Sequence, residues 1–347
     1  MLANFFNGKT ILVTGHTGFK GSWLVTWLEM LGANVHGLSL DPSAVNFHWS
    51  KLSLGNVSSH NIDIRNLSSL KRVIRDIRPD IIFHLAAQSL VIPSYKQPLE
   101  TWETNVIGTA NLLHACQGQG NIGSILIATS DKCYKNDELN KNFIETDPLG
   151  GADPYSASKA SAEIVTHSFE KSYFSETLTS LCSMRAGNVI GGGDMSEYRL
   201  IPDLIRAVEK KDTLMVRNPK STRPWQHVLD CLHGYLLLAI HSYNSRQRFN
   251  GPWNFGPSKS QIASVENIVT ICKNHWPIIS WEVEGSIQNN EAKTLQINSD
   301  KAQKELNWNN IWNLEKSVKE TVLWYKSDLI EKKIITKDQI IEFTNDI

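Results

Sequence analysis

Short apolar runs alternate with segments of helical periodicity over much of the chain. Such runs are typical of strands that are buried on both faces. The predicted strands cover residues 11–13, 34–40, a short run that ends at 63–64, 80–87, 124–129 and a run that ends at 186. Apolar residues at helical spacing predict helices between them, as in residues 67–77 and 98–116. This alternation predicts an α/β fold, a Rossmann-type doubly wound parallel sheet with helices on both faces.

The first predicted strand leads directly into a glycine-rich turn and a helix, within residues 10–32. Gly15, Gly18 and Gly21 have the spacing Gly-x-x-Gly-x-x-Gly, between the strand and the helix that a dinucleotide-binding turn requires. The N–H groups at the start of the helix would then meet a diphosphate. We predict that this turn, with Thr17 and Phe19, binds a nicotinamide dinucleotide. The alternative is an ordinary structural turn in an open sheet.

The residue that usually distinguishes NAD from NADP lies at the end of the second strand. An acidic side chain is usual there and binds the ribose hydroxyls, but this chain has Ser39, with Asp41 two residues later. No arginine stands beside Ser39 to bind a 2′-phosphate, so the predicted cofactor is NAD. Asp63 is placed to reach the adenine, or else serves as a carboxylate ahead of the next helix. The other residues predicted to contact the cofactor are Ile64, Ala86, Ala87, Gln88, Asn105, Tyr155 and Lys159.

The remaining part of the chain is predicted to form a smaller lobe. We assign residues 1–186 to an NAD-binding domain, to which residues 228–256 return as a helix and a last strand. Residues 187–227 and 257–347 then form a smaller α/β lobe that binds the substrate. Tryptophans of this lobe are predicted to lie in its core, and the charged segment beyond Asp328 has no assigned role.

Composition and charge narrow the class of protein. The 347 residues include 35 basic and 35 acidic side chains. This balance argues against binding to nucleic acid or to an anionic membrane surface, which attract an excess of basic residues. The five cysteines form no C-x-x-C pair, which argues against a disulfide framework or a cysteine zinc site, and we predict no metal site. We expect a cytoplasmic protein, because the sequence shows neither a signal peptide nor a membrane-spanning apolar run.

Polar side chains with complementary acid–base chemistry follow the fifth predicted strand. Ser130, Asp131 and Lys132 place a hydroxyl, a carboxylate and an amine at the carboxyl end of a central strand, where ligands of such sheets bind. These groups suit proton transfer. Taken alone, Asp131 and Lys132 could equally form a solvated pair on a loop.

A second group of candidate residues follows in the helix that is predicted after Asp153. Asp153 can cap this helix and Pro154 can occupy its first turn, which places Tyr155 and Lys159 one turn apart on one face. A neighbouring ammonium group lowers the pKa of a phenol, so Tyr155 could act as a base near neutral pH. Tyr-x-x-x-Lys is frequent by chance, but together with the glycine turn and Ser130 it becomes a specific set.

With these motifs, the chain resembles the extended short-chain dehydrogenases/reductases, and among them the CDP-glucose 4,6-dehydratase family. The resemblance covers residue 10 to about residue 260 and rests on TGHTGFKGSWL, HLAAQSLV, TNVIGTANLL, TSDKCY, DPYSASKASAE, RAGNVIGGGD, RLIPDLIRA and TRPWQHVLD. TSDKCY discriminates best, since related epimerases lack its Asp-Lys pair and related dTDP-glucose and GDP-mannose dehydratases carry Asp-Glu or a similar pair. Departures are Ile92 and Pro93, where the family tends to have basic residues, and Met195 in place of a frequent Trp.

The resemblance implies NAD-dependent loss of water from CDP-D-glucose to give CDP-4-keto-6-deoxy-D-glucose, for deoxysugar and surface-polysaccharide biosynthesis, in a homodimer. Tyr155, beside Ser130, would take the proton of the sugar 4-hydroxyl. Lys132 would remove the C5 proton, and Asp131 would donate a proton to the departing C6 hydroxyl. Arginine suits the diphosphate because its planar fork donates two parallel hydrogen bonds. The residues predicted to bind the nucleotide sugar are Gln88, Ser89, Asn188, Arg199, Arg217 and Arg223.

Other functions remain open at this point. A sugar-nucleotide 4-epimerase needs Tyr155, Lys159 and the same cofactor but no acid–base chemistry at Asp131 and Lys132. A 4,6-dehydratase for another nucleotide sugar would use all of them. A regulatory protein of the same fold that senses dinucleotides without catalysis is a further alternative.

Overall fold

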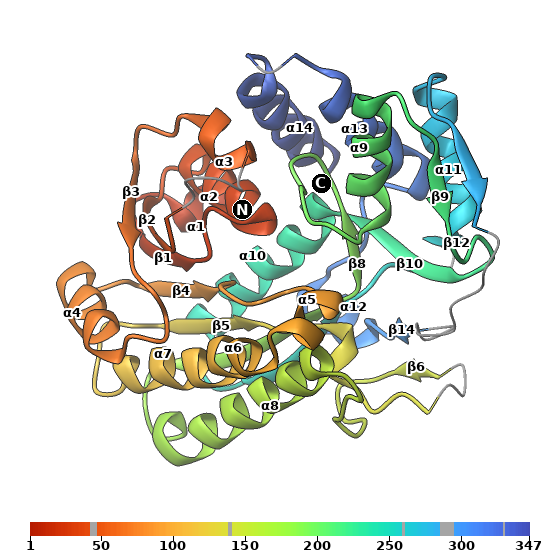
Figure 1. The fold of residues 1–347 in the computed structure, drawn as a ribbon. Helices are drawn as coiled ribbons and strands as arrows, with labels where there is room; N and C mark the ends of the chain where they lie inside the picture. Colours follow the sequence, from red (N-terminus) through yellow and green to blue (C-terminus); the bar gives the residue numbers. More distant parts are fainter. Residues whose placement is uncertain (42–46, 138–140, 259–260, 285–294, 329) are drawn as a thin grey trace.

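A seven-stranded parallel sheet forms the centre of the structure, a computed structural model that describes residues 1–41, 47–137, 141–258, 261–284, 295–328 and 330–347 (Figure 1). The order of the strands is β11-β7-β5-β4-β1-β2-β3, so the chain moves outward in opposite directions from β1 and β4. The strands are β1 (Thr10–Thr14), β2 (Asn34–Ser39), β3 (Val57–Asn61), β4 (Ile81–His84), β5 (Ser124–Ala128), β7 (Ser180–Ala186) and β11 (Gly251–Phe255). This topology confirms the predicted Rossmann-type fold, and its switch point lies between β1 and β4.

Helices cover both faces of the sheet. One face carries α1 (Leu2–Phe6), α2 (Phe19–Met30) and α10 (Val228–Asn244), and the other carries α4 (Leu67–Ile77), α7 (Gly108–Cys116) and α8 (Pro154–Phe169). Side chains of β1 alternate between two cores, since Ile11 and Val13 pack in one and Leu12 in the other. Burial on both faces explains why the strand is a continuous apolar run.

The local elements follow the predictions with three differences. The helix predicted over residues 98–116 is interrupted by a π-helical turn, η1 (Glu103–Ile107), between α6 (Pro98–Trp102) and α7. Between β4 and α6, where no helix is predicted, the chain forms a short helix, α5 (Val91–Lys96). The third strand ends at Asn61, so Asp63 and Ile64 lie beyond it, where Asp63 Oδ1 accepts the N–H of Arg65 and turns the chain toward α4.

A second group of elements packs beside the carboxyl ends of the central strands. It contains the strands β8 (Asn188–Ile190), β9 (Leu214–Val216), β10 (Thr222–His227), β12 (Ile262–Ser264) and β13 (Trp281–Val283), and the helices α9 (Leu200–Lys210), α11 (Val265–His275) and α13 (Leu314–Lys326). These elements share a core of their own. Strand β11 joins the main sheet beside β7, and α10 packs on β5 and β7.

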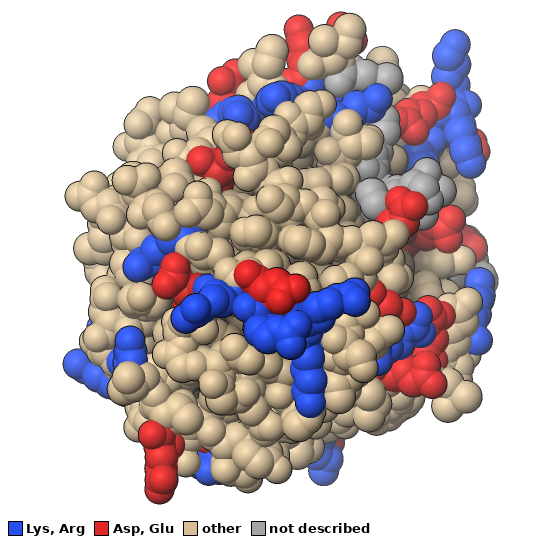
Figure 2. Space-filling view, turned by 90° about the vertical axis from the view of Figure 1, so that its left-hand side faces the viewer, with Lys and Arg blue, Asp and Glu red and all other residues tan. Residues whose placement is uncertain are grey.

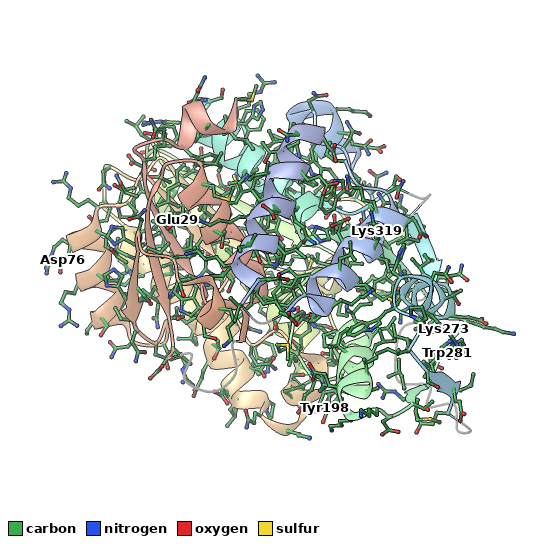
Figure 3. The ribbon with its side chains drawn as sticks, turned by 90° about the horizontal axis from the view of Figure 1, so that it is seen from above. Glu29, Asp76, Tyr198, Lys273, Trp281 and Lys319 are labelled. Carbon is green, nitrogen blue, oxygen red and sulfur yellow. The ribbon has the colours of Figure 1, made fainter. Side chains whose placement is uncertain are left out.

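The segment beyond Asp328, which has no role predicted from sequence, contains the helix α14 (Lys332–Asp346). The buried ammonium of Lys332 donates hydrogen bonds to the carbonyl oxygens of Trp324 (2.5 Å) and Ser327 (2.7 Å) at the end of α13. Helix α14 also packs on α2, where Lys337 lies 3.6 Å from Glu29 (Figure 3). Helix α14 therefore connects the end of the chain to α2, the helix that follows the glycine-rich turn.

The tryptophans of the second lobe divide into two groups. Trp308, Trp312 and Trp324 are fully buried, as predicted, whereas Trp276 and Trp281 are only partly buried against the lobe's core. Trp225 is buried, and its indole N–H donates to the carbonyl of Ala263, although the ring also borders the cavity described below.

The surface carries charges of both signs. On the face drawn in Figure 2, Lys and Arg side chains are interspersed with Asp and Glu side chains. Within the described ranges, no helix is long and apolar enough to cross a membrane, and no group of three or more His, Cys, Asp or Glu side chains could hold a metal ion.

Candidate active site

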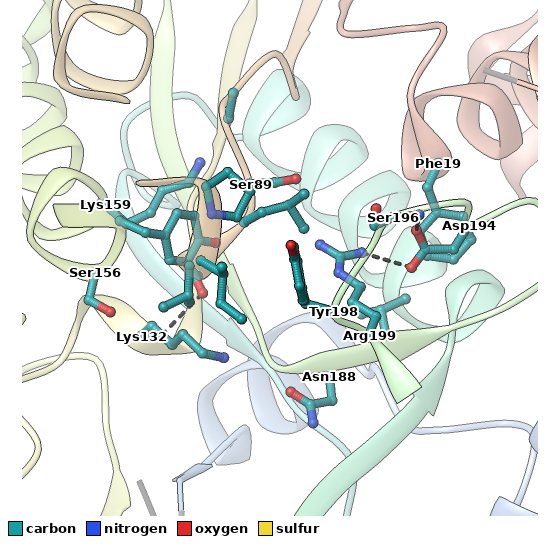
Figure 4. A pocket seen from close by; sticks show the side chains of 18 of the residues that line it. Phe19, Ser89, Lys132, Ser156, Lys159, Asn188, Asp194, Ser196, Tyr198 and Arg199 are labelled. Atoms are coloured by element: carbon teal, nitrogen blue, oxygen red, sulfur yellow. Dashed lines mark hydrogen bonds and ion pairs between the residues drawn. The ribbon is translucent and has the colours of Figure 1, made fainter. Parts of the chain in front are cut away.

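A cavity of about 1570 Å³ lies along the carboxyl ends of the central strands and extends to the second lobe (Figure 4). Its position agrees with the switch point of a doubly wound sheet. All but two of the residues predicted for the site line it. The predicted residues that line the cavity are Gly15, Thr17, Gly18, Phe19, Gly21, Ser39, Asp63, Ile64, Ala86, Ala87, Ser89, Ser130, Asp131, Lys132, Tyr155, Lys159, Asn188, Arg199, Arg217 and Arg223.

The three glycines of the turn after β1 are under different constraints. Gly15 has a φ of 71°, and a Cβ there would lie 2.7 Å from the backbone nitrogen of Ala86. A Cβ on Gly21 would lie 2.1 Å from the carbonyl oxygen of Gly15. Gly18 precedes α2 and borders the cavity, and a Cβ there would meet only the Gly15 oxygen, at 3.2 Å. The turn therefore brings bare backbone and a helix N-terminus to the cavity, which suits a dinucleotide diphosphate.

The end of the cavity beside β2 carries carboxylates. Ser39 lies at the end of β2, and its hydroxyl donates to the carbonyl of Leu40 (2.9 Å), while Asp41 follows on the cavity wall. Asp63 forms a bidentate pair with Arg65, with a closest distance of 2.6 Å. The hydrogen bonds from the Arg65 guanidinium are the main cause that holds the pKa of Asp63 below its ordinary value. Carboxylates at this end favour ribose hydroxyls over a 2′-phosphate.

Gln88 and Asn105, both predicted to contact ligands, do not line the cavity. The Gln88 side chain folds back onto its own loop, where it donates to the carbonyl of Leu90 (2.9 Å) and to Thr101 (3.0 Å). Asn105 is buried and exchanges hydrogen bonds with the Gln88 backbone at 2.8 and 2.9 Å. Their side chains therefore shape the loop after β4, and the contact of these two residues with a ligand stays a prediction.

The residues that follow β5 place three chemically different groups together. Asp131 and Lys132 begin the single turn η2 (Asp131–Cys133), and Ser130 precedes it. The Ser130 hydroxyl donates to Asp131 Oδ1 (3.0 Å), and the Lys132 ammonium lies 3.7 Å from the same oxygen. The Asp131 side chain is 4% exposed and that of Lys132 is 37% exposed. Asp131 and Lys132 therefore form a half-buried pair at the cavity, and the alternative of a fully solvated loop pair does not hold.

Helix α8 supplies Tyr155 and Lys159 as the sequence spacing predicts. Asp153 caps the helix by accepting the N–H of Ser156 (3.0 Å), and Pro154 occupies its first turn. Both functional side chains are buried at the cavity wall. The helix thus presents a phenol and an amine to the space that borders Ser130.

The electrostatics of this pair differ from the prediction. Burial raises the pKa of Tyr155 above its usual value, and the charge of Lys132 and a hydrogen bond with Ser130 oppose this rise. Lys159 instead donates to the carbonyl of Ala128 (3.1 Å). Burial, followed by the charge of Lys20, lowers the pKa of Lys159 to about 8. The cation that most favours ionised Tyr155 is therefore Lys132, not Lys159.

The second lobe provides the cationic end of the cavity. Arg199 forms an ion pair with the buried Asp194 (2.8 Å), as Figure 4 shows, and Asp194 also accepts the N–H of Ser196. Although burial opposes it, this pairing raises the pKa of Arg199. Arg223 on β10 donates to the carbonyl of Thr222 (2.8 Å) and reaches the cavity wall. Several arginines at one end of an elongated cavity suit a phosphorylated ligand.

Three residues on the cavity wall were missed by the reasoning from sequence. Lys20 is inside the glycine turn, and its position between Phe19 and Gly21 could have marked it as a cofactor contact. Asp194 ends the glycine-rich stretch after β8, but nothing in the sequence indicates that it pairs with Arg199. Tyr198 has a φ of 64°, which is strained for a non-glycine residue, and its side chain extends into the cavity in Figure 4.

His227 has a structural role. The ring caps α10, where Nδ1 accepts the N–H of Leu229 (3.3 Å). Complete burial lowers the pKa of His227 to about 3, so the ring stays neutral. It does not line the cavity and takes no part in acid–base chemistry there.

Comparisons with known proteins agree with this fold. The family described as GDP-mannose 4,6 dehydratase matches residues 12–321. The CDP-glucose 4,6-dehydratase of Salmonella typhimurium is 43% identical over 331 residues, which cover 93% of this chain and 92% of that protein. The solved structure of MoeE5 in complex with UDP-glucuronic acid and NAD is 25% identical, with a TM-score of 0.77 and coverage of 91% of this chain and 98% of that chain. An epimerase from Methanothermobacter thermautotrophicus has the same fold, with 23% identity, a TM-score of 0.81 and coverage of 97% and 96%.

Proposed function

Because the chain belongs to the GDP-mannose 4,6-dehydratase family, we propose that it is an NAD-dependent CDP-glucose 4,6-dehydratase. It removes water from CDP-D-glucose and yields CDP-4-keto-6-deoxy-D-glucose, a precursor for deoxysugars of surface polysaccharides. The observation that carries this proposal is that Tyr155 and Lys159 of α8 share one cavity with Asp131 and Lys132 of the segment after β5. The 43% identical relative from Salmonella typhimurium supports the choice of CDP-glucose.

The cofactor fits the near end of the cavity. Gly15, Gly18 and Gly21 leave room for the diphosphate at the start of α2, and Ser39 and Asp41 stand where the adenosine ribose would lie. A carboxylate at Asp41 repels a 2′-phosphate, so NAD is favoured over NADP. When bound, NAD would supply a hydride acceptor for C4 of the sugar and a hydride donor for C6.

The first chemical task of the protein is proton removal from the 4-hydroxyl. Tyr155 takes this proton as the base; the positive charge of Lys132 favours its phenolate against the effect of burial, and Ser130 holds the same sugar oxygen by a hydrogen bond. Lys159 brings a second amine to the same cavity wall, and its hydrogen bond to the carbonyl of Ala128 fixes its position. The resulting 4-keto group makes the proton on C5 acidic.

The second task is elimination across C5 and C6. The Lys132 ammonium first passes a proton to solvent. As the neutral amine it takes the C5 proton, and Asp131, in its protonated form, donates a proton to the departing C6 hydroxyl, which leaves as water. Lys132 then returns its proton to C5 as C6 is reduced. Finally Tyr155 releases to solvent the proton that it gained, and Asp131 and Lys132 each take one up, so the net change is the loss of one water. Arg199, Arg217 and Arg223, with Asn188 and Ser89, hold the nucleotide diphosphate and sugar.

The surface of the molecule supports a homodimer as the working unit. Helices α6, η1 and α8, and the π-helical turn η3 (Glu170–Phe174) that follows α8, expose apolar side chains: Leu99 (76% exposed), Trp102, Ile107, Ile164 (58% exposed) and Tyr173. Helices with exposed apolar side chains can pair across a two-fold axis and bury this area. The five cysteines are buried free thiols, which is consistent with a reducing cytoplasm.

Mass spectrometry of the products tests the function directly. The purified protein with NAD is incubated separately with CDP-, UDP-, dTDP- and GDP-glucose, and we expect a loss of one water from CDP-glucose alone. Loss of water from another nucleotide sugar would keep the reaction and overturn the assignment of the base. Unchanged mass with all four would favour an epimerase or a non-catalytic protein, and the NMR spectrum of the recovered sugar would distinguish these two.

A further inference from the structure

A buried ion pair lies directly behind the catalytic groups. Glu163 on α8 and Arg185 on β7 are joined at 2.8 Å, and the side chain of each is only 3% exposed. Neither residue lines the cavity. Burying such a pair costs desolvation energy, and apolar side chains of the same size are often at least as stable, so stability alone does not explain it.

The contacts of this pair lead to the catalytic segment from both of its ends. Thr129, at the end of β5, donates its hydroxyl hydrogen bond to Glu163 Oε1. Arg185 donates to the hydroxyl of Tyr134 at 2.8 Å, and its guanidinium lies 4.8 Å from the centre of the Tyr134 ring. Thr129 and Tyr134 bracket Ser130, Asp131 and Lys132, so the pair fixes both ends of the segment that carries them.

The same pair also joins this segment to the helix that carries the other catalytic groups. Glu163 lies one turn beyond Lys159 and two turns beyond Tyr155, on the same face of α8. We propose that Glu163 and Arg185 are positioning residues, which hold the 130–132 segment at a fixed distance from Tyr155 and Lys159. This role rests on the proposed function, because it concerns the alignment of the two groups that this reaction requires.

The charges within the pair suit this role. Burial alone would raise the pKa of Glu163, but the charge of Arg185 and hydrogen bonds from Arg185, Ser183 and Thr129 hold it below its ordinary value. Glu163 therefore stays an anion, and its charge opposes the loss of the Lys159 proton. Hydrogen bonds to an ionised partner are roughly twice as strong as neutral ones, which suits a rigid anchor.

Two hydroxyls that bind the same carboxylate provide a matched test. Thr129→Val removes the hydrogen bond from the catalytic segment to Glu163, whereas Ser183→Ala removes the bond from β7 at 2.6 Å and leaves the segment attached. We expect Thr129→Val to lower kcat about 10- to 100-fold with KM changed less than about threefold, since misplacement of catalytic groups acts on the transition state. Ser183→Ala should keep kcat within about twofold of the wild type, and Thr129→Ser should restore it.

Amide hydrogen exchange measures the positioning without any substrate. We expect exchange in residues 130–135 to become faster in Thr129→Val and to stay unchanged in Ser183→Ala. Equal loss of activity in both variants, or wild-type kcat and exchange in Thr129→Val, would overturn the positioning role. If the wild-type protein leaves CDP-glucose unchanged, the proposed function fails, and the exchange comparison by itself then decides whether the segment is held by Glu163.

Discussion

The ammonium of Lys132 lies 3.7 Å from Asp131 Oδ1, and of the two side chains only Lys132 is substantially exposed to the cavity. A base for the C5 proton must reach the sugar, whereas an acid for the C6 hydroxyl can act from a more buried position. Lys132→Ala should therefore stop elimination, whereas oxidation at C4, which loses only the charge of Lys132 near Tyr155, should be slowed much less. We expect reduced nicotinamide to accumulate, which its absorbance measures, and the rate of water loss to fall at least about 100-fold.

The exposed Lys141, which pairs with Asp147 outside the cavity, provides the control for that experiment. Lys141→Ala removes one lysine at about the same exposure and should leave turnover unchanged. Product formed at the wild-type rate by Lys132→Ala would show that Lys132 is not the base.

Lys159 should set the alkaline limit of activity. Its pKa is lowered to about 8 by burial and by the charge of Lys20. As the pH rises through about 8 the ammonium loses its proton, so we expect kcat at saturating substrate to decline above that pH. Lys20→Met removes one cause of the lowered pKa and should move the decline to higher pH. An alkaline limb at the same pH in both proteins would argue against this coupling.

Gly21 should tolerate no side chain. A Cβ there would lie 2.1 Å from the carbonyl oxygen of Gly15, and both partners are backbone that cannot move aside independently. We expect Gly21→Ala to lower the free energy of unfolding by at least about 1–3 kcal/mol, measured by thermal unfolding. It should also weaken NAD binding, measured by calorimetry. Gly55→Ala is the control, since a Cβ there meets no atom within 4 Å. Equal NAD affinity in the two variants would contradict the steric explanation.

Asp230 should make the stability depend on pH. Burial raises its pKa to about 7, and Oδ1 accepts the N–H of Ile311 at 2.6 Å. The folded protein holds this proton up to about pH 7, whereas the unfolded chain releases it near the ordinary value of 3.8. Between these values the free energy of unfolding should fall with rising pH by up to about 1.4 kcal/mol per pH unit.

Asp230→Asn isolates that contribution from other titrating groups. Unfolding in urea at several pH values should show the variant gaining stability relative to the wild type as the pH rises from 5 to 7. Parallel stability curves for the two proteins would mean that Asp230 is ionised in the folded state.

The proposed dimer should depend on the exposed apolar face of α8. Ile164→Asp places a charge in that face, and we expect light scattering to give the mass of one chain for this variant and of two chains for the wild type. Ile341→Asp on α14 is the control, with similar exposure at 49% on a helix that packs on α2, against the other face of the sheet. If the wild-type protein has the mass of one chain, the proposed homodimer is wrong.

The sequence by itself determined the features that depend on near neighbours in the chain. Gly15, Gly18 and Gly21 mark a turn in which a side chain at Gly15 or Gly21 would clash with backbone, and the helical spacing of Tyr155 and Lys159 places them on one face. Apolar runs buried on both faces likewise specify a parallel sheet, because no other arrangement covers them.

Only the tertiary structure decided which side chains from distant segments meet. The side-chain amide of Asn105 forms hydrogen bonds with the backbone of Gln88, in the loop after β4. Glu163 forms its ion pair with Arg185 on β7, 22 residues later in the chain. The pKa of Tyr155 depends on burial and on Lys132, which approaches from another element. Such outcomes depend on the packing of whole elements against each other, and local periodicity carries no information about that packing.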